Sequence, residues 1–369
     1  MSAAANPGRP AKAPAHLADF DAAGRDAWAE RLGQPRMRLR QAARHYFARL
    51  TRTASDMTDL PARERDQLVQ TLLPELAREA GRQTADGGRT VKTVYRLFDS
   101  TPVEAVLMAY PGRATLCVSS QAGCGMGCPF CATGQLGLVR NLSAAEMLEQ
   151  VRLAAAQVQA GLFGRRGPAR LSNVVFMGMG EPLANYAALV RALRAISAAP
   201  PDGFGISARN LTVSTCGLVG AMDRLAAEGL PVRLALSLHA PDDEARNRLV
   251  PVNQRYGVRQ TIAAAHRYHQ ATGRRVSIEY ALIGEINDQP WRAAQLARRL
   301  CQYGTGWVHV NPIPLNPVEG SIWTASRPEA QERFLRILEG SGLRVTLRDT
   351  RGREIDGACG QLAAREVLN

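Results

Sequence analysis

The chain has 369 residues, with 46 Lys and Arg against 33 Asp and Glu, so its formal net charge is +13. A hydrophobic fraction of 46% excludes overall disorder, and a chain of this length buries enough surface to fold without disulfides. No uncharged apolar run approaches the ~20 residues of a membrane span. Residues 1–16 lack the apolar stretch of a secretory signal. We therefore expect a cytoplasmic protein.

Arginine supplies nearly all of the positive charge, because Lys12 and Lys92 are the only lysines. This skew is typical of a GC-rich genome, yet the excess charge still favours a polyanionic partner through counterion release. Four Arg-rich segments are candidate RNA contacts, although each alone is more typical of a solvated surface. They are Arg36–Arg44, Arg165–Arg166, Arg274–Arg275 and Arg344–Arg353.

The first part of the chain indicates a disordered tail over residues 1–16 and a helical accessory domain over residues 17–88. Apolar residues recur among Arg and Glu up to Thr84, with Pro35, Pro61 and Pro74 as helix boundaries. The domain ends at a turn over residues 86–88. Two strands, at 90–98 and 103–109, then form a β extension over residues 89–113.

Residues 114–369 alternate short β-rich runs with helical stretches, which predicts an α/β fold of parallel βα units in an open or closed barrel. The first of these helices begins with a capping box, Ser143 and Glu146. In such a fold the ligand residues lie at the carboxyl ends of the strands. The six strands are predicted at 115–119, 173–177, 211–215, 232–238, 276–282 and 308–312.

Seven cysteines, an odd number, favour metal or redox chemistry over a disulfide framework. Cys124, Cys128 and Cys131 have the spacing C-x3-C-x2-C after the first barrel strand, with glycines at 123, 125 and 127. Three thiolates leave one iron of a 4Fe–4S cluster open to an outside ligand. The alternative is a zinc site that adds Cys117 and staples a non-catalytic RNA-binding protein. Cys117 lies inside a strand, seven residues before Cys124, and this spacing differs from that of the ligands in a zinc ribbon.

This cysteine spacing resembles the radical S-adenosylmethionine (SAM) superfamily. From about residue 90 onward the chain resembles more closely the RlmN family of RNA adenine-C2 methyltransferases, with a weaker match in the N-terminal helices. The matching strings, in order, are CVSSQ at 117–121, FCATG at 130–134, RNL at 140–142, MGMGEP at 177–182, SLHA at 237–240 and IDGACG at 355–360.

The resemblance implies a partial (β/α)6 radical-SAM barrel with an N-terminal helical RNA-binding domain. It implies one 4Fe–4S cluster per chain on Cys124, Cys128 and Cys131. It also implies SAM contacts, among which Gly180-Glu181 receives the amino group of the cofactor. The full set of implied SAM contacts is Gly180, Glu181, Ser214, Ser237, Leu238, His239 and Asn316.

The resemblance further implies a catalytic role for two cysteines that the cluster does not need. One SAM methylates Cys359, and a second, cleaved at the cluster, yields a radical that takes a hydrogen from the S-methyl group. The thiomethylene radical adds to adenine carbon 2, an amidine carbon that is not a nucleophile. Cys117 then resolves the crosslink as a transient disulfide with Cys359, and Glu104 is the implied proton acceptor.

The implied substrates are adenosines in 23S rRNA (position 2503) and in tRNA (position 37). The implied partners are an electron donor such as flavodoxin or ferredoxin and a thiol reductant, and we expect a monomer. Methylation of carbon 8, as in the Cfr family, remains an alternative within the same chemistry. A radical enzyme acting on a peptide is a further alternative, but it would require an auxiliary cysteine cluster. Cys216 and Cys301 are predicted to be small structural side chains with no part in the cluster.

Overall fold

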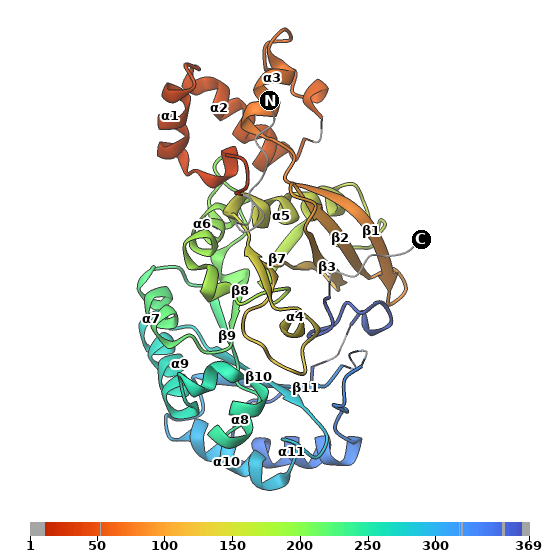
Figure 1. Ribbon diagram of the computed structural model, residues 1–369, viewed down its shortest axis with the longest axis vertical. Helices are drawn as coiled ribbons and strands as arrows, with labels where there is room; N and C mark the ends of the chain where they lie inside the picture. Colours follow the sequence, from red (N-terminus) through yellow and green to blue (C-terminus); the bar gives the residue numbers. More distant parts are fainter. Residues whose placement is uncertain (1–11, 52, 317, 319, 349–350, 364–369) are drawn as a thin grey trace.

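The computed structural model describes residues 12–51, 53–316, 318, 320–348 and 351–363. Its N-terminal helices α1 (Ala22–Arg31), α2 (Arg36–Ala43) and α3 (Arg65–Leu72) form a separate layer at the top of Figure 1. Residues 1–11 of the predicted disordered tail lie outside the described residues. At the end of that predicted tail, His16 is buried and its Nδ1 accepts a hydrogen bond from the backbone of Ala18. Ordered structure therefore begins earlier than the sequence indicates.

The helical part also ends earlier than predicted, because residues 77–85 form a strand. That strand, β1 (Ala77–Ala85), pairs antiparallel with β2 (Thr90–Leu97), which pairs in turn with β3 (Pro102–Tyr110). The predicted strands at 90–98 and 103–109 correspond to β2 and β3. Strand β3 pairs antiparallel with the first barrel strand, so the β extension continues the sheet of the barrel.

Six parallel strands form the barrel, and each lies at or within two residues of its predicted position. They continue the sheet in the order β4-β7-β8-β9-β10-β11. No pairing between β4 and β11 occurs among the described residues, so the barrel is open, as the partial (β/α)6 fold predicts. The strands are β4 (Arg113–Cys117), β7 (Leu171–Phe176), β8 (Leu211–Thr215), β9 (Arg233–Ser237), β10 (Val276–Leu282) and β11 (Val308–Pro314).

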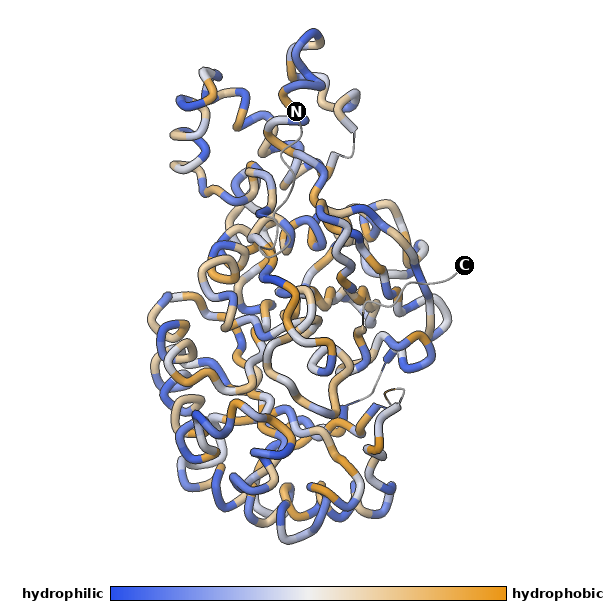
Figure 2. Tube along the Cα trace, in the orientation of Figure 1, coloured by the Kyte–Doolittle hydropathy of each residue, from blue (hydrophilic) through white to orange (hydrophobic). Residues whose placement is uncertain are grey.

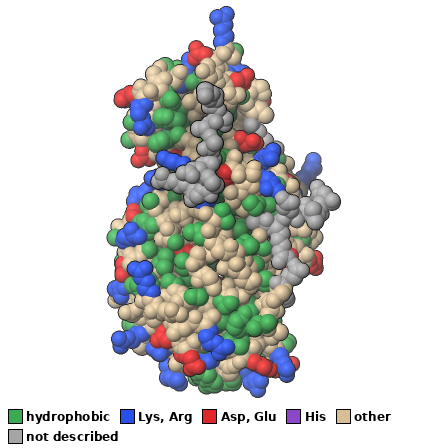
Figure 3. Space-filling view, in the orientation of Figure 1, with side chains coloured by type: hydrophobic (Ala, Val, Ile, Leu, Met, Phe, Trp, Pro, Cys, Tyr) green, Lys and Arg blue, Asp and Glu red, His purple; other side chains and the backbone are tan. Residues whose placement is uncertain are grey.

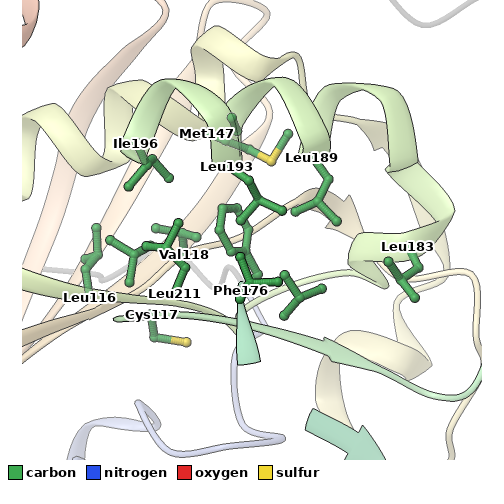
Figure 4. Packing of buried hydrophobic residues seen from close by; sticks show 14 of the residues in the cluster. Leu116, Cys117, Val118, Met147, Phe176, Leu183, Leu189, Leu193, Ile196 and Leu211 are labelled. Carbon is green, nitrogen blue, oxygen red and sulfur yellow. The ribbon is translucent and has the colours of Figure 1, made fainter. Parts of the chain in front are cut away.

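Helices cover the outer face of this sheet, as parallel βα units require. Figure 4 shows Met147, Leu189 and Ile196 from two of them packed over Leu116 and neighbouring strand residues. In Figure 2 the hydrophobic stretches gather at the sheet, while hydrophilic stretches follow the outer turns. The helices are α5 (Ala144–Gln159), α6 (Tyr186–Ser197), α7 (Val219–Ala227), α8 (Asp243–Leu249), α9 (Val258–Thr272), α10 (Pro290–Cys301) and α11 (Pro328–Gly340).

Helix α5 begins at the capping box predicted from the sequence. The Ser143 side chain accepts a hydrogen bond from the Glu146 backbone, and the Glu146 carboxylate accepts one from the Ser143 backbone. Glu146 also holds the Arg140 guanidinium, which is paired on its other side with Asp99. This ion-pair network ties the hairpin of β5 (Gln121–Gly123) and β6 (Leu138–Asn141) to the barrel.

The described C-terminal segment, residues 351–363, closes over the open side of the sheet. Backbone Ala132, in the short helix α4 (Ala132–Gln135), donates a hydrogen bond to the Gly360 carbonyl, and Thr133 donates one to the Leu362 carbonyl. At its other end, the Gly352 backbone donates to Asp86. The segment thus joins the cluster loop to the β extension. No described helix is both long enough and apolar enough to cross a bilayer.

Candidate active site

The loop after β4 brings three cysteines to one cavity at the carboxyl ends of the barrel strands. Cys124, Cys128 and Cys131 line this cavity, whose volume is about 1050 Å³ including its open mouth. Gly123 and Gly127 adopt φ angles of 71° and 66°, which a residue with a side chain adopts only under strain. These glycines let the loop turn tightly, as predicted.

The donor set fits an iron–sulfur cluster better than a single ion. Among the described residues, no group of three or more Cys, His, Asp or Glu side chains is placed to hold one metal ion. A four-iron cluster is wider than an ion, so its thiolate ligands stand apart around it. Burial raises the pKa of Cys124 to about 12 and also raises the pKa of Cys131. The thiolate forms therefore depend on the positive charge of bound iron.

The segment after β7 places Gly180 and Glu181 on the wall of the same cavity. Gly180 has a φ of +102°, and a Cβ on it would lie 2.5 Å from the Cβ of Gln121. Only glycine fits there. The Gln121 Oε1 atom in turn accepts a hydrogen bond of 2.8 Å from the Glu181 backbone. The β5 hairpin and the β7 loop therefore hold each other in place.

Glu181 is a buried carboxyl group with two backbone donors. Its Oε1 accepts a hydrogen bond from backbone Leu183 at 3.0 Å, and its Oε2 accepts one from backbone Cys216 at 2.7 Å. Burial raises the pKa of Glu181 to about 7, although these two hydrogen bonds act in the opposite direction. No cationic side chain of the described residues is among the main influences on the pKa of Glu181. A bound ammonium group would supply the missing positive charge.

His239 follows β9 and lines the cavity in a neutral form. Burial and the Arg246 guanidinium lower the pKa of His239 to about 3. Backbone Ala281 donates a hydrogen bond of 2.9 Å to its Nδ1 atom, so the ring proton is on Nε2. The ring stands edge-to-face against Phe130 of the cluster loop, with centroids 5.0 Å apart. Its Nε2–H is therefore a fixed donor.

The remaining predicted SAM contacts lie at or near the carboxyl ends of strands. Ser214 near the end of β8, Ser237 at the end of β9 and Asn316 after β11 line the cavity. Leu238 lies between cavity residues but its own side chain is fully buried, away from the cavity lining. The Asn316 Oδ1 atom is buried and has no hydrogen-bond partner. That free acceptor requires a donor from a ligand, which the hydroxyl or amino groups of SAM would provide.

A second cavity, of about 530 Å³, brings Cys117 and Cys359 together. Cys359 lines both cavities, so it lies between the cavity of the three loop cysteines and Cys117. Cys117 is the last residue of β4, and Figure 4 shows its sulfur on the face opposite Leu116 and Val118. Burial, with Cys359 as the second cause, raises the pKa of Cys117 to about 12. Residues 242 positions apart in sequence thus share one pocket, as their predicted pairing requires.

Arg348 lies at the junction of the two cavities, and sequence reasoning missed this role. It lines both cavities, and its Nη1 is 3.4 Å from the Glu279 carboxylate. Cys359 is the first cause of a raised pKa for Arg348, and both residues line the two cavities. The sequence offers only an Arg-rich stretch here, which is a candidate RNA contact and alone is more typical of a solvated surface. Residues 349–350 of that stretch lie outside the described residues.

Glu104 lies next to this region but not on a cavity wall. It is buried on β3, with its Oε1 atom 3.4 Å from the Lys92 Nζ atom, and its Oε2 accepts a hydrogen bond from backbone Ala363 at 3.0 Å. Glu104 is not among the described residues that line either cavity. Its role as proton acceptor stays a prediction.

Cys216 was predicted to be a structural residue apart from the cluster, but it lines the same cavity as the three loop cysteines. It packs with Cys128 and Cys131 in one small apolar cluster. Cys301, at the end of α10, lies away from both cavities and its sulfur faces the Ser341 carbonyl at 3.6 Å.

The Arg-rich segments do not form one patch around the cavity. Arg36 pairs with Glu30, and Arg40 lies 3.4 Å from Asp26, so part of the first segment is neutralised locally. Arg274 and Arg275 directly precede β10, at the end of the sheet opposite the cavity. In Figure 3 the Lys and Arg side chains of the visible face are scattered along its edges.

Comparison with known proteins agrees with this site. The sequence-family model described as the Radical SAM superfamily matches residues 118–297 of this chain. A "Probable dual-specificity RNA methyltransferase RlmN" from Bifidobacterium adolescentis is 57% identical, over 97% of this chain and 92% of that protein. A protein of the same description from Nocardioides sp. is 58% identical, over 96% of this chain and 95% of that protein. The chain belongs to the RlmN family.

A solved structure supports the same family. The crystal structure of a radical SAM methyltransferase from Sphaerobacter thermophilus superposes with a TM-score of 0.89 at 42% identity, covering 95% of this chain and 100% of that one. The RlmN family consists of radical-SAM RNA methyltransferases, so the predicted enzyme class, α/β barrel, SAM and iron–sulfur cofactors, and RNA substrate are confirmed at this level. The non-catalytic zinc-binding alternative does not agree with this membership.

Proposed function

We propose that this enzyme methylates carbon 2 of adenosine, in 23S rRNA at position 2503 and in tRNA at position 37. The observation that carries the proposal is the shared pocket of Cys117 and Cys359, which opens through Cys359 onto the cluster cavity. A methyltransferase acting on a nucleophilic atom needs no such cysteine pair. The curated relatives described as dual-specificity enzymes support two RNA substrates.

When bound, the cluster and SAM supply a methyl group and a carbon-centred radical, with two SAM molecules consumed per product. Cys124, Cys128 and Cys131 hold the cluster. Glu181 pairs with the amino group of SAM, and Asn316 Oδ1 accepts a hydrogen bond from it. The neutral His239 donates from Nε2 into the same cavity. These residues orient the cofactor and exclude water.

Cys359 carries the methyl group to the RNA. A hydrogen atom of its S-methyl group would pass to the carbon-centred radical, and the resulting methylene carbon would bond to adenine carbon 2; loss of the C2 proton and of one electron, which would return to the iron–sulfur centre, completes this step. The Cys117 thiolate then attacks the Cys359 sulfur. The carbon–sulfur bond breaks with its electron pair left on the methylene carbon, which takes up a proton and becomes the methyl group, and a Cys117–Cys359 disulfide remains. Glu104, held by Lys92, is the proposed acceptor of the adenine proton. A cellular thiol reductant returns both cysteines to thiols, which fits the reducing conditions of the cytoplasm.

The N-terminal domain over residues 17–88, whose helices are followed by β1, and the Arg residues of the surface are proposed to contact RNA phosphates. Such contacts position a substrate without reading its sequence. The target adenine must leave its stack to reach Cys359. The protein acts as a monomer, and flavodoxin or ferredoxin is the proposed electron donor.

Nucleoside mass spectrometry tests the proposal. Unmodified 23S rRNA and tRNA are incubated anaerobically with cluster-loaded enzyme, reductant and SAM, and the digests are compared with authentic 2-methyladenosine and 8-methyladenosine. We expect 2-methyladenosine in both RNAs. The 8-methyl product would move the reaction to the Cfr type, and the absence of both products would refute the proposal.

A further inference from the structure

The second cavity, which holds Cys117 and Cys359, has a positively charged lining. Among the described residues, its charged lining side chains are Arg348 and Arg351, and no Asp or Glu is among them. Glu279, which pairs with Arg348, lines the first cavity and not this one. The second cavity has a volume of about 530 Å³ including its mouth. Its charge therefore favours a small anionic ligand.

The rim of this cavity is formed by β3 and the C-terminal segment. Tyr110, the last residue of β3, is partly exposed, and the guanidinium groups of Arg113 and Arg351 each lie 4.6 Å from the centroid of its ring. The Arg351 Nη1 atom also donates a hydrogen bond of 3.4 Å to the Ala109 carbonyl. Neither Tyr110 nor Arg351 lines the first cavity. A ligand at this rim therefore approaches from the β3 side.

The two cysteines are arranged so that their disulfide is open to attack from this side. The inference rests on the proposed function, which ends with a Cys117–Cys359 disulfide. Cys117 lines only the second cavity, whereas Cys359 lines both. Thiol–disulfide exchange proceeds by attack of a thiolate on one sulfur, from the side opposite to the sulfur that leaves. For attack on Cys117 with departure of Cys359, this path enters from the second cavity.

The burial of Cys117 limits the size of the attacking molecule. Cys117 is only 8% exposed, so a protein reductant would have to bring its own backbone to the bottom of the cavity. A small thiol needs room for only one sulfur and the carbon atoms behind it. The charge of the lining and the narrow access thus indicate a small anionic thiol.

We propose that the second cavity binds a low-molecular-weight thiol with a carboxylate or another anionic group, and that this thiol reduces the Cys117–Cys359 disulfide. The anionic group lies against Arg351 while the thiolate bonds to the Cys117 sulfur and expels Cys359 as a thiolate. A second molecule attacks the sulfur of the first and releases Cys117, and the two leave as one oxidised dimer. The two electrons and two protons of the small thiols end on the two cysteines.

Reduction from this side leaves the first cavity undisturbed. The three loop cysteines and the proposed SAM contacts Glu181 and His239 line the first cavity but not the second. The reductant therefore reaches Cys117 without displacing a cofactor held by these residues.

Two thiols that differ in charge test the proposal. Cluster-loaded enzyme completes a single turnover on RNA without thiol and is desalted, and peptide mass spectrometry verifies its Cys117–Cys359 disulfide. The disulfide is then reduced with anionic 2-mercaptoethanesulfonate or neutral 2-mercaptoethanol at equal thiolate concentrations. Samples are quenched with N-ethylmaleimide, and labelled Cys117 is followed over time. The same thiols acting on a small neutral disulfide give their intrinsic rate ratio.

Two variants locate the charge effect. Arg351→Gln removes the cation at the rim of the second cavity. Arg344→Gln is the matched control, because Arg344 is exposed and lines neither cavity. In the wild type, the anionic thiol is expected to exceed the intrinsic ratio about fivefold, the factor that one charge pair about 4 Å apart contributes in water. Arg351→Gln should lose this preference, Arg344→Gln should keep it, and high salt should reduce it in the wild type.

The possible failures are distinguishable. A wild-type ratio equal to the intrinsic one would overturn the proposal, as would a preference that Arg351→Gln retains. Reduction by a thioredoxin-type protein, with neither small thiol active, would also overturn it. An enzyme that turns over without forming the disulfide would instead refute the resolution step of the proposed function.

Discussion

Glu181 should make the binding of SAM depend on pH. Burial raises the pKa of its carboxyl group from an ordinary 4.5 to about 7, while only the ionised form pairs with the ammonium of the cofactor. With a pKa of about 7, roughly a tenth of the sites are ionised at pH 6 and roughly nine tenths at pH 8. The dissociation constant is therefore expected to fall about tenfold between these two pH values.

Isothermal titration of cluster-loaded protein with SAM, without reductant, measures this constant. Glu181→Gln is the matched control, because SAM itself titrates identically against both proteins. The ratio of the two dissociation constants thus reports only the carboxyl group. A ratio that stays constant from pH 6 to pH 8 would refute the reasoning. The variant is expected to bind at least ~10-fold more weakly at pH 8, as is common when one partner of a buried charge pair is removed.

The same raised pKa has a consequence for stability without SAM. When the pKa of a carboxyl group is higher in the folded state than in the unfolded state, the folded state loses stability as pH rises from the lower pKa to the higher one. For Glu181 the interval runs from 4.5 to about 7, which corresponds to at most about 3 kcal/mol. Glu181→Gln should therefore gain stability relative to wild type between pH 5 and pH 8, measured as the midpoint of chemical unfolding.

Three further predictions concern residues around the site. Cys117→Ala should leave protein covalently bound to RNA, because the bond from Cys359 to adenine carbon 2 forms but no thiol is present to release the RNA. Normal turnover, with no crosslinked protein on a denaturing gel, would contradict the proposed role of Cys117. Arg348→Gln should slow alkylation of Cys359 by iodoacetamide at neutral pH several-fold, since it removes the cation beside that sulfur, whereas an unchanged rate would place the guanidinium elsewhere. Arg140→Met leaves the buried Glu146 carboxylate and the partly buried Asp99 carboxylate without their cation, so the free energy of unfolding is expected to fall by about 3–5 kcal/mol; a loss below about 1 kcal/mol in urea titrations would contradict the network.

Local patterns in the sequence predicted the barrel well. The strands β8 and β10 were placed correctly to the residue, because runs such as Val276–Leu282 are rich in β-branched, aromatic and other apolar residues. The capping box at Ser143 likewise needs only local information. Strand β1 was missed, since residues 77–85 are mostly polar and include Gly81, with no alternation to mark a buried face. Its pairing with β2 overrides that weak local preference.

The site could be predicted only where a motif marked it. The cluster cysteines and Gly180 lie in recognisable strings, and the structure brings them together. The cavity positions of Arg348 and Cys216 were not predicted, because an Arg in an Arg-rich stretch and a Cys after a strand have no local sign of what they face. Both reach the cavity only through the tertiary arrangement of the strands and the segments that follow them.

The attachment of the C-terminal segment has a consequence for the order of folding. The hydrogen bond from Thr133 to Leu362 closes a loop of 229 residues, and contacts so distant in sequence form late. The described residues of the segment form no strand, and hydrogen bonds such as those from Thr133 to Leu362 and from Asn316 to Cys359 attach them to the barrel, so the segment is expected to open locally while the barrel stays folded. In the proposed reaction Cys359 meets a methyl donor, an adenine and Cys117 in turn, and local opening of this segment would let one side chain reach all three.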